Sequence, residues 1–287
     1  MEVLRPTSLD EALAMRAEQP DATVLQGGTD VMVEINFGRL DPVAVLDLSE
    51  VPELRGVTRT DGRVRIGAGV TYADLMTGDV ATTLPALAEA SRTVGSPQIR
   101  NRGTVAGNLG SASPAGDAHP PLLAAGATVE VESVRGTRLV PVAEFFTGVK
   151  RNALDDDELI VAFEIAPADG PQQFAKIGTR NAMVIAVCSL SVHLWPRERA
   201  VKACIGSAGP TPIRAHEAEA FAAGALDWES RAPLGAAAAA EFGALVDRAA
   251  RPIDDVRGTA AYRHHALGVL ARRALRWTWD EYRGETA

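Results

Sequence analysis

Two turns in this sequence carry the residue types that bind an anion. In the first, Val24-Leu25 has the character of a strand and runs into Gln26-Gly27-Gly28-Thr29-Asp30. Paired glycines let successive backbone N–H groups converge on an anion, and Thr29 adds a hydroxyl donor. The alternative is a tight strand-to-helix turn in which Asp30 is the helix cap.

The second turn is Thr104-Val105-Ala106-Gly107-Asn108-Leu109-Gly110, which lies between Arg102 and a stretch rich in serine. It combines little side-chain bulk with hydroxyl and amide donors, as a diphosphate requires. A solvated loop is the alternative. Because neither turn opens a long helix as a P-loop does, the two turns together predict a ligand whose pyrophosphate lies between two loops. A dinucleotide cofactor fits this description.

Other catalytic motifs are missing from the sequence. Gly67-Ala68-Gly69 resembles the start of a dinucleotide fingerprint, but Tyr72 stands where the third glycine belongs. The sequence has no P-loop, no zinc-protease pair of histidines and no nucleophile elbow. Its five histidines are not grouped with carboxylates or cysteines. We therefore expect no catalytic acid, base or nucleophile and no metal site on this chain.

The apolar patterns and turn residues predict the elements that must position these turns. The segment 95–126 has no apolar period over most of its length and is expected to be a long ligand-binding loop. Residues 167–171, with their prolines and glycine, are the clearest linker. Strands are expected at 23–25, 43–48, 63–66, 128–131, 138–142, 158–165, 174–176, 184–194 and 200–205, and helices at 9–17, from Thr71, and at 85–92, 214–223, 234–251 and 259–283.

Composition bounds the class of protein. A chain of 287 residues with 46% hydrophobic and 23% charged residues is typical of a soluble globular protein of two modules. The net charge of −8 argues against nucleic acid as a partner. Cys188 and Cys204 are too few for an iron–sulfur cluster and are expected to be buried thiols. Without a leader-like segment or a transmembrane run, the expected location is cytoplasmic.

Four motifs in a fixed order carry a resemblance: LQGGTDVM, IGAGVTYADL, RNRGTVAGNLGSASPAGD and FAKIGTRNAMVIAV. Together they resemble the FAD-binding medium subunit of the molybdenum hydroxylases, the family of xanthine, carbon monoxide and nicotine dehydrogenases. The resemblance covers essentially the whole chain. It implies an α+β protein with an FAD-binding domain of the vanillyl-alcohol-oxidase/p-cresol-methylhydroxylase type, built of two α/β subdomains, over 1–168. A C-terminal α+β domain, with a three-stranded antiparallel sheet and helices, is implied over 172–287.

The resemblance also implies which residues contact FAD. Asp117 matches an acid at the adenosine part, Ile160 an apolar residue against the cofactor, and Lys176 a lysine near it. Their alternatives are a cap of the turn before Pro120, an ordinary buried strand residue and a surface lysine on an edge strand. The two glycine turns match the loops around the pyrophosphate, with Leu25, Gln26, Gly27, Gly28, Thr29, Asp30 and Val31 in the first, and Thr104, Val105, Ala106, Gly107 and Asn108 in the second.

Two positions depart from the family pattern. Ala106 stands where many relatives have glycine, so its methyl group must point away from the phosphate if the site is intact. Met183 or Val184 stands where many relatives carry an aspartate near the flavin ring, which leaves the electron acceptor open. The first loop has Gln26 and no histidine, so the expected FAD is noncovalent.

By resemblance, this chain is an electron-transfer subunit and an oxidoreductase. A large partner holds molybdopterin, a small partner holds [2Fe–2S] clusters, and FAD on this chain passes electrons to NAD or another acceptor. A dimer of heterotrimers is expected, in a xanthine dehydrogenase-like or other complex that oxidises N-heterocycles. The alternatives are a carbon monoxide dehydrogenase medium subunit, a stand-alone FAD-dependent reductase of the same fold, and a scaffold whose flavin site has decayed.

Overall fold

The structure is a computed structural model that describes residues 1–181 and 183–284. The chain forms two compact units, and neither is continuous in sequence. Unit 1 comprises residues 1–75, 96–113 and 126–166, and unit 2 comprises 76–95, 114–125 and 167–287. Two segments of the first 168 residues thus cluster with the C-terminal part, while the expected domain limits of 1–168 and 172–287 remain a prediction.

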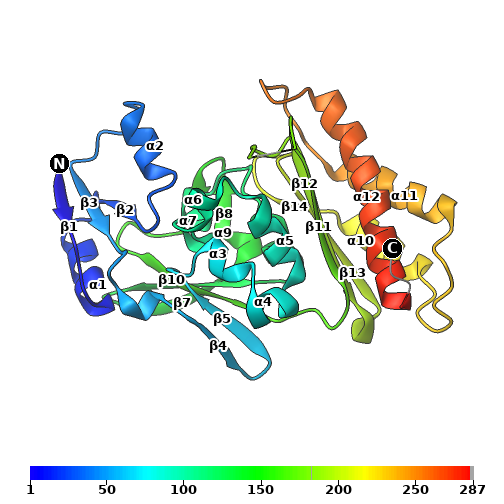
Figure 1. The fold of residues 1–287 in the computed structure, drawn as a ribbon, viewed down its shortest axis with the longest axis horizontal. Coiled ribbons are helices and arrows are strands. Elements are labelled where there is room, and N and C mark those ends of the chain that lie inside the picture. The colour runs from blue at the N-terminus through cyan, green and yellow to red at the C-terminus, as the bar shows by residue number, and fades with distance from the viewer. Residues whose placement is uncertain (182, 285–287) are drawn as a thin grey trace. The chain divides into compact units, whose positions relative to one another are not determined.

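Unit 1 contains a parallel and an antiparallel sheet (Figure 1). The parallel sheet has the spatial order β1 (Glu2–Leu4), β3 (Ala44–Asp47), β2 (Thr23–Leu25). The antiparallel sheet has the order β4 (Val57–Thr60), β5 (Arg63–Gly67), β10 (Leu159–Ile165), β6 (Thr128–Ser133), β7 (Gly136–Pro141). A short hairpin joins β8 (Phe146–Gly148) and β9 (Arg151–Asn152).

The helices of unit 1 are short, except α1. Side-chain caps begin several of them: Ser8 accepts from the Glu11 N–H, Ser96 from the Ile99 N–H and Thr104 from the Gly107 N–H. The helices are α1 (Leu9–Glu18), α2 (Val31–Asn36), η1 (Pro52–Leu54), α3 (Tyr72–Leu75), α6 (Pro97–Arg100), α7 (Val105–Ser111) and α9 (Val142–Phe145).

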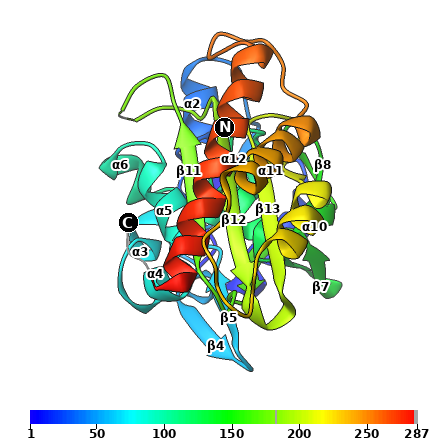
Figure 2. The same cartoon turned by 90° about the vertical axis from the view of Figure 1, so that its right-hand side faces the viewer.

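Unit 2 is an antiparallel sheet with helices packed against both of its faces (Figure 1), and Figure 2 looks onto the face that the C-terminal helices cover. The sheet order is β11 (Gln172–Ile177), β12 (Cys188–Trp195), β13 (Ala200–Gly206), β14 (Ile213–Arg214), with η2 (Pro196–Glu198) between β12 and β13. Helices α10 (His216–Ala225), α11 (Ala236–Ala249) and α12 (Ala260–Arg283) pack on one face around a core that includes Leu190, Phe242 and Trp279. Helices α4 (Gly78–Thr83), α5 (Pro85–Thr93) and α8 (His119–Ala124) complete the unit.

The expected fold class is confirmed: both units combine helices with sheets, and the C-terminal sheet is antiparallel. The two-residue strand β14 extends this sheet beyond the three strands expected. The expectation of an irregular loop over 95–126 was wrong, because α6, α7 and α8 lie within it. These helices are too short to show an apolar period; Ser96 and Thr104 cap α6 and α7, whereas α8 has no side-chain cap.

Candidate functional site

The two glycine turns lie directly against each other within unit 1. A Cβ atom added to Gly27 would be 2.0 Å from the carbonyl oxygen of Arg102, and one added to Gly103 would be 3.1 Å from the Thr29 hydroxyl oxygen. Gly28 has a φ of +72°, a left-handed conformation that favours glycine. The glycines of the first turn are therefore fixed by contact with the second turn and by backbone conformation.

The second turn is the first turn of helix α7. The Thr104 hydroxyl accepts a hydrogen bond of 2.9 Å from the Gly107 N–H, and an antiparallel bridge joins Thr104 to Thr71. Thr71 and Asp74 form a capping box at α3, in which the Thr71 N–H donates to the Asp74 carboxylate at 3.0 Å. The solvated-loop alternative is therefore wrong for Thr104 to Gly110, because this stretch is an ordered, capped helix.

The first turn presents polar groups that have no protein partner. No hydrogen bond within residues 1–181 and 183–284 has the backbone N–H of Gly28, Thr29 or Asp30 as its donor. Asp30 is the N-cap residue of α2, as the alternative of a strand-to-helix turn expects, but its side chain makes no capping hydrogen bond. The buried Oε1 of Gln26 also has no hydrogen-bond partner. A ligand with phosphate acceptors and a donor group would satisfy these atoms.

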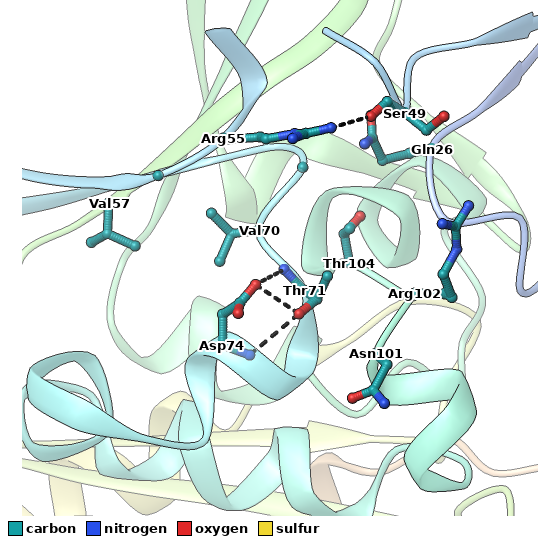
Figure 3. Close-up of a pocket in the computed structure, with 12 residues that line it drawn as sticks. Gln26, Ser49, Arg55, Val57, Val70, Thr71, Asp74, Asn101, Arg102 and Thr104 are labelled. Carbon is teal, nitrogen blue, oxygen red and sulfur yellow. Dashed lines mark hydrogen bonds between the residues drawn. The ribbon is translucent and has the colours of Figure 1, made fainter. Parts of the chain in front are cut away.

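A cavity of about 360 Å³ adjoins both turns through Gln26 and Thr104 (Figure 3). Its volume is near the lower end of the range for small-molecule sites, about 300–1,000 Å³. Arg55 and Arg102 give the cavity positive charge, and Val57 and Val70 form an apolar part of its wall. Arg55 donates a 2.6 Å hydrogen bond to the Ser49 carbonyl, whereas the Arg102 guanidinium has no hydrogen-bond acceptor among the described residues. This chemistry suits a phosphorylated, partly apolar ligand.

Ile160 lies next to the second turn in unit 1. It sits at an irregularity between β10 and β6, where the pairing shifts between Ile160 and Ala162. Its Cδ1 atom is 3.8 Å from the position of a Cβ atom on Gly110 of helix α7. Bulges of this kind often redirect a side chain near a functional site. Ile160 is a buried residue of β10, as its alternative expects, and its contact with a cofactor remains a prediction.

Asp117 and Lys176 are paired inside unit 2. The Lys176 ammonium donates to Asp117 Oδ2 at 2.5 Å and to the Thr93 carbonyl at 3.0 Å. Both side chains are only 7% exposed, so the surface-lysine alternative is wrong although β11 is an edge strand. Asp117 does not cap α8, whose cap residue is Ala118. Burial raises the pKa of Asp117, and the Lys176 ammonium opposes this rise.

The predicted site residues are thus gathered in two groups, one in each unit. Unit 1 holds both turns and Ile160, and unit 2 holds Asp117 and Lys176. Reasoning from the sequence missed Arg55, Val57, Val70 and Thr93. Thr93 lies one residue beyond the helix expected at 85–92 and is the last residue of α5; the other three reach the site through tertiary packing.

The structure also shows the surroundings of the residues that depart from the family pattern, Ala106, Met183 and Val184. Ala106 is 5% exposed, so its methyl group is buried in the protein and does not project from the turn. Met183 is half exposed, and its carbonyl accepts two hydrogen bonds from the Arg180 guanidinium, at 3.0 and 2.7 Å. Val184 packs against Gly178. No carboxylate occupies either position.

Three further observations concern the remaining expectations. Cys188 and Cys204 are free and buried, as expected, and burial raises the pKa of Cys188 to about 12. Within the described part of the chain, no three metal-ligating side chains form a cluster. In the same residues, no helix combines the length and the apolar character needed to cross a bilayer.

This fold and these turns define an α+β protein built to hold a dinucleotide, and comparison with known proteins identifies the family. The model of the FAD binding domain in molybdopterin dehydrogenase matches residues 1–168, and that of the CO dehydrogenase flavoprotein C-terminal domain matches 173–278. The chain belongs to this family of molybdopterin dehydrogenase flavoproteins. It carries an FAD-binding domain, and its relatives are dehydrogenase and hydroxylase subunits.

Individual relatives are similar along their whole length. The chain is 30% identical to the xanthine dehydrogenase FAD-binding subunit of Escherichia coli O157:H7, with 94% of this chain and 93% of that one covered. It is 32% identical to the nicotine 6-hydroxylase medium subunit of Paenarthrobacter nicotinovorans, with 94% of each covered. A carbon monoxide dehydrogenase structure from Hydrogenophaga pseudoflava superposes with a TM-score of 0.87 at 26% identity and 98% coverage of both chains.

Proposed function

We propose that this chain is the FAD-carrying electron-transfer subunit of a molybdenum hydroxylase. In this proposal a small partner supplies electrons from [2Fe–2S] clusters, a large partner holds the molybdenum cofactor, and NAD or another acceptor takes the electrons. Xanthine-like or other N-heterocyclic compounds are the proposed substrates of the whole complex, which is a dimer of heterotrimers in the cytoplasm. The FAD-binding domain spans 1–168 and the C-terminal domain 172–287.

The packing of the two glycine turns is the observation that carries this proposal. Contact between Gly27 and the Arg102 carbonyl brings unpaired N–H groups, the orphaned Gln26 oxygen and a charged cavity into one place. A diphosphate needs such donors, and a nucleotide needs such a cavity. The residues present therefore fit FAD. The buried Asp117 Oδ1, which has no partner, is a further acceptor suited to a ligand donor.

The protein's part in the reaction is to hold and orient the cofactor. Bound FAD supplies the redox chemistry, accepting and releasing electrons. Backbone groups of residues 27–31 and 104–108 would hold the pyrophosphate of FAD. Arg55 and Arg102 would add positive charge beside it, and Val57 and Val70 would offer an apolar surface to a ring of the cofactor. Lys176 fixes Asp117 through an ion pair of 2.5 Å. No residue of this chain needs to move a proton to or from the substrate.

Two other readings make different predictions for the isolated chain. A stand-alone reductase would turn over NAD(P)H or its own substrate without partners, whereas an electron-transfer subunit would show little specific turnover. A scaffold with a decayed flavin site would bind no FAD. The buried methyl group of Ala106 argues against decay at that position, since it leaves the turn open. A carbon monoxide dehydrogenase medium subunit would differ only in the partner it joins.

Purification of the native complex through a tag on this chain tests the proposal. We expect mass spectrometry to find two associated chains, with molybdopterin and iron in the same preparation. The isolated chain should reduce acceptors slowly, and addition of the partners should restore turnover. Recovery of the chain alone, together with full NAD(P)H turnover, would favour the stand-alone reductase.

A further inference from the structure

Thr93, at the end of helix α5, contacts the buried Asp117 and Lys176 pair in unit 2. Its hydroxyl lies 3.1 Å from Asp117 Oδ2 and 2.8 Å from the Ala90 carbonyl. Its backbone carbonyl accepts the second hydrogen bond of Lys176, at 3.0 Å. A single residue therefore contacts both members of the ion pair, one through its side chain and one through its main chain.

The two oxygens of Asp117 are unequal. Oδ2 receives the Lys176 ammonium at 2.5 Å and faces the Thr93 hydroxyl, whereas the buried Oδ1 has no hydrogen-bond partner in the described chain. A buried carboxylate oxygen without a donor is costly, by about 1–3 kcal/mol or more, unless a ligand or water supplies one. The contacts to Oδ2 also fix the rotation of the carboxylate, and so the direction of Oδ1.

Lys176 has an unused donor beside this acceptor. An ammonium group has three N–H bonds, and two acceptors are present, Asp117 Oδ2 and the Thr93 carbonyl. The pair therefore offers one acceptor and one donor. A ligand edge with an N–H or O–H group beside a carbonyl or hydroxyl oxygen complements this arrangement, and FAD has such edges.

We propose that Thr93 is a positioning residue for the cofactor: with Lys176 it holds Asp117 Oδ2 so that Oδ1 accepts a hydrogen bond from an N–H or O–H donor of FAD. This inference rests on the proposed function, because it takes FAD as the ligand. Thr93 itself need not touch FAD. Its effect passes through the orientation of the carboxylate, so loss of the hydroxyl weakens binding without removing a charge.

Thr93→Val in the full-length chain tests this role, because valine keeps the shape and removes only the hydroxyl. We expect FAD affinity, measured by quenching of flavin fluorescence, to fall about tenfold, which corresponds to one hydrogen bond to a charged group. The flavin absorption bands should shift as well, and Thr93→Ser should restore both. Thr82→Val is the matched control, since the exposed Thr82 hydroxyl contacts only the Gly78 carbonyl of its own helix, at 3.4 Å.

The possible outcomes separate the inference from the proposed function. FMN and ADP each represent one half of FAD. Thr93→Val should lose affinity for one of these two ligands and keep its affinity for the other. The inference would be overturned if Thr93→Val bound FAD as tightly as wild type, or if Thr93→Ser bound it as weakly as Thr93→Val. In either case FAD binding by the wild-type chain would still support the proposed function. A wild-type chain that binds no FAD would overturn both. Equal thermal midpoints of Thr93→Val and Thr82→Val would show that the fold is not the cause.

Discussion

Gly27 and Gly107 are both glycines of the predicted cofactor loops, but they are required for different physical reasons. A Cβ atom on Gly27 would lie 2.0 Å from a backbone oxygen of the other turn, a contact that no side-chain movement relieves. A Cβ atom on Gly107 would meet only the Thr104 hydroxyl oxygen, at 3.2 Å. Gly27 thus serves the packing of the protein, whereas a Cβ atom on Gly107 is crowded by a single side-chain oxygen and by no backbone atom outside its own helix.

Substitutions at these two glycines should therefore have different effects, one on the stability of the fold and the other on FAD binding. Gly27→Ala must push the turns apart and should lower the free energy of unfolding by more than about 2 kcal/mol, as measured by urea titration. Gly107→Val should leave the far-ultraviolet circular dichroism and the unfolding midpoint nearly unchanged and should abolish FAD retention. FAD retention should be lost because the valine side chain would occupy the place where the backbone of the second turn is expected to approach a phosphate of FAD.

Gly224→Ala is the control for these variants. Gly224 lies in helix α10 with nothing within 4 Å of a Cβ atom, so alanine there should be neutral or stabilising by up to about 1 kcal/mol. Full flavin occupancy in Gly107→Val would show that the second turn is misassigned. A fully stable Gly27→Ala chain would contradict the loop contact.

At the scale of elements, the segment before helix α12 is held by a buried arginine. The Arg263 guanidinium, with 5% of its side chain exposed, donates to Asp255 Oδ1 at 2.5 Å and to the Ser207 carbonyl at 2.8 Å. The Arg257 N–H donates to the same Asp255 oxygen at 2.8 Å. This network ties the turn of residues 255–258 to the strand β13 side of the unit 2 sheet.

Asp255 predicts a pH dependence for this network. Burial raises the pKa of Asp255, but hydrogen bonds from Arg257 and Arg263 outweigh burial and bring the pKa down to about 2. A carboxylate with a lowered pKa stabilises the fold above its unfolded pKa, and this contribution is lost as the pH falls toward the folded value. Asp255→Asn should cost about 2 kcal/mol near pH 7, and the difference from wild type should shrink between about pH 4 and pH 2.

Asp41→Asn provides the comparison for that measurement, because Asp41 is exposed and its side chain has no hydrogen bond or ion pair with the described residues. Its unfolding free energy should match wild type throughout the pH range. A constant difference between Asp255→Asn and wild type down to about pH 2 would mean that the Asp255 charge does not contribute.

Local signals in the sequence predicted many helices and strands. They failed to predict the role of residues whose position depends on contacts with distant parts of the chain. The cap at Ser8, the Thr71 and Asp74 pair and the proline at Pro85 each marked a helix that the structure contains. The Gly67-Ala68-Gly69 motif is no dinucleotide fingerprint: it is the end of strand β5 and the turn that follows. A Cβ atom on Gly67 would lie 2.4 Å from the Leu54 carbonyl, which also accepts the Gly69 N–H at 2.6 Å.

The same contact explains why part of the candidate site could not be predicted. The packing of Gly67 and Gly69 on Leu54 brings the neighbouring Arg55 and Val57 beside the cavity. No pattern in the sequence relates these residues to Gln26 or Thr104. The glycine turns could be singled out in the sequence because their hydrogen-bond donors and backbone freedom are local features, and their contact with the cofactor remains a prediction.

At the scale of the whole molecule, the chain carries an FAD-binding domain, and its two cysteines are free and buried. Its cysteines are buried and inert, since burial raises the pKa of Cys204 as well as that of Cys188. They cannot ligate a cluster, so the iron–sulfur centres of the proposed complex belong to a partner. Each unit also contains buried polar atoms without a hydrogen-bond partner among the described residues, Gln26 Oε1 in unit 1 and Asp117 Oδ1 in unit 2.

The central claim is that this chain binds FAD without a covalent bond. The most direct measurement is a titration of the purified full-length chain with FAD, followed by the visible absorption spectrum and the thermal unfolding midpoint. We predict a saturable flavin spectrum, release of free FAD on denaturation, and a midpoint that rises with FAD concentration because the ligand binds only the folded state. A colourless chain that cannot be reconstituted, with an unfolding midpoint that does not respond to FAD, would contradict the account.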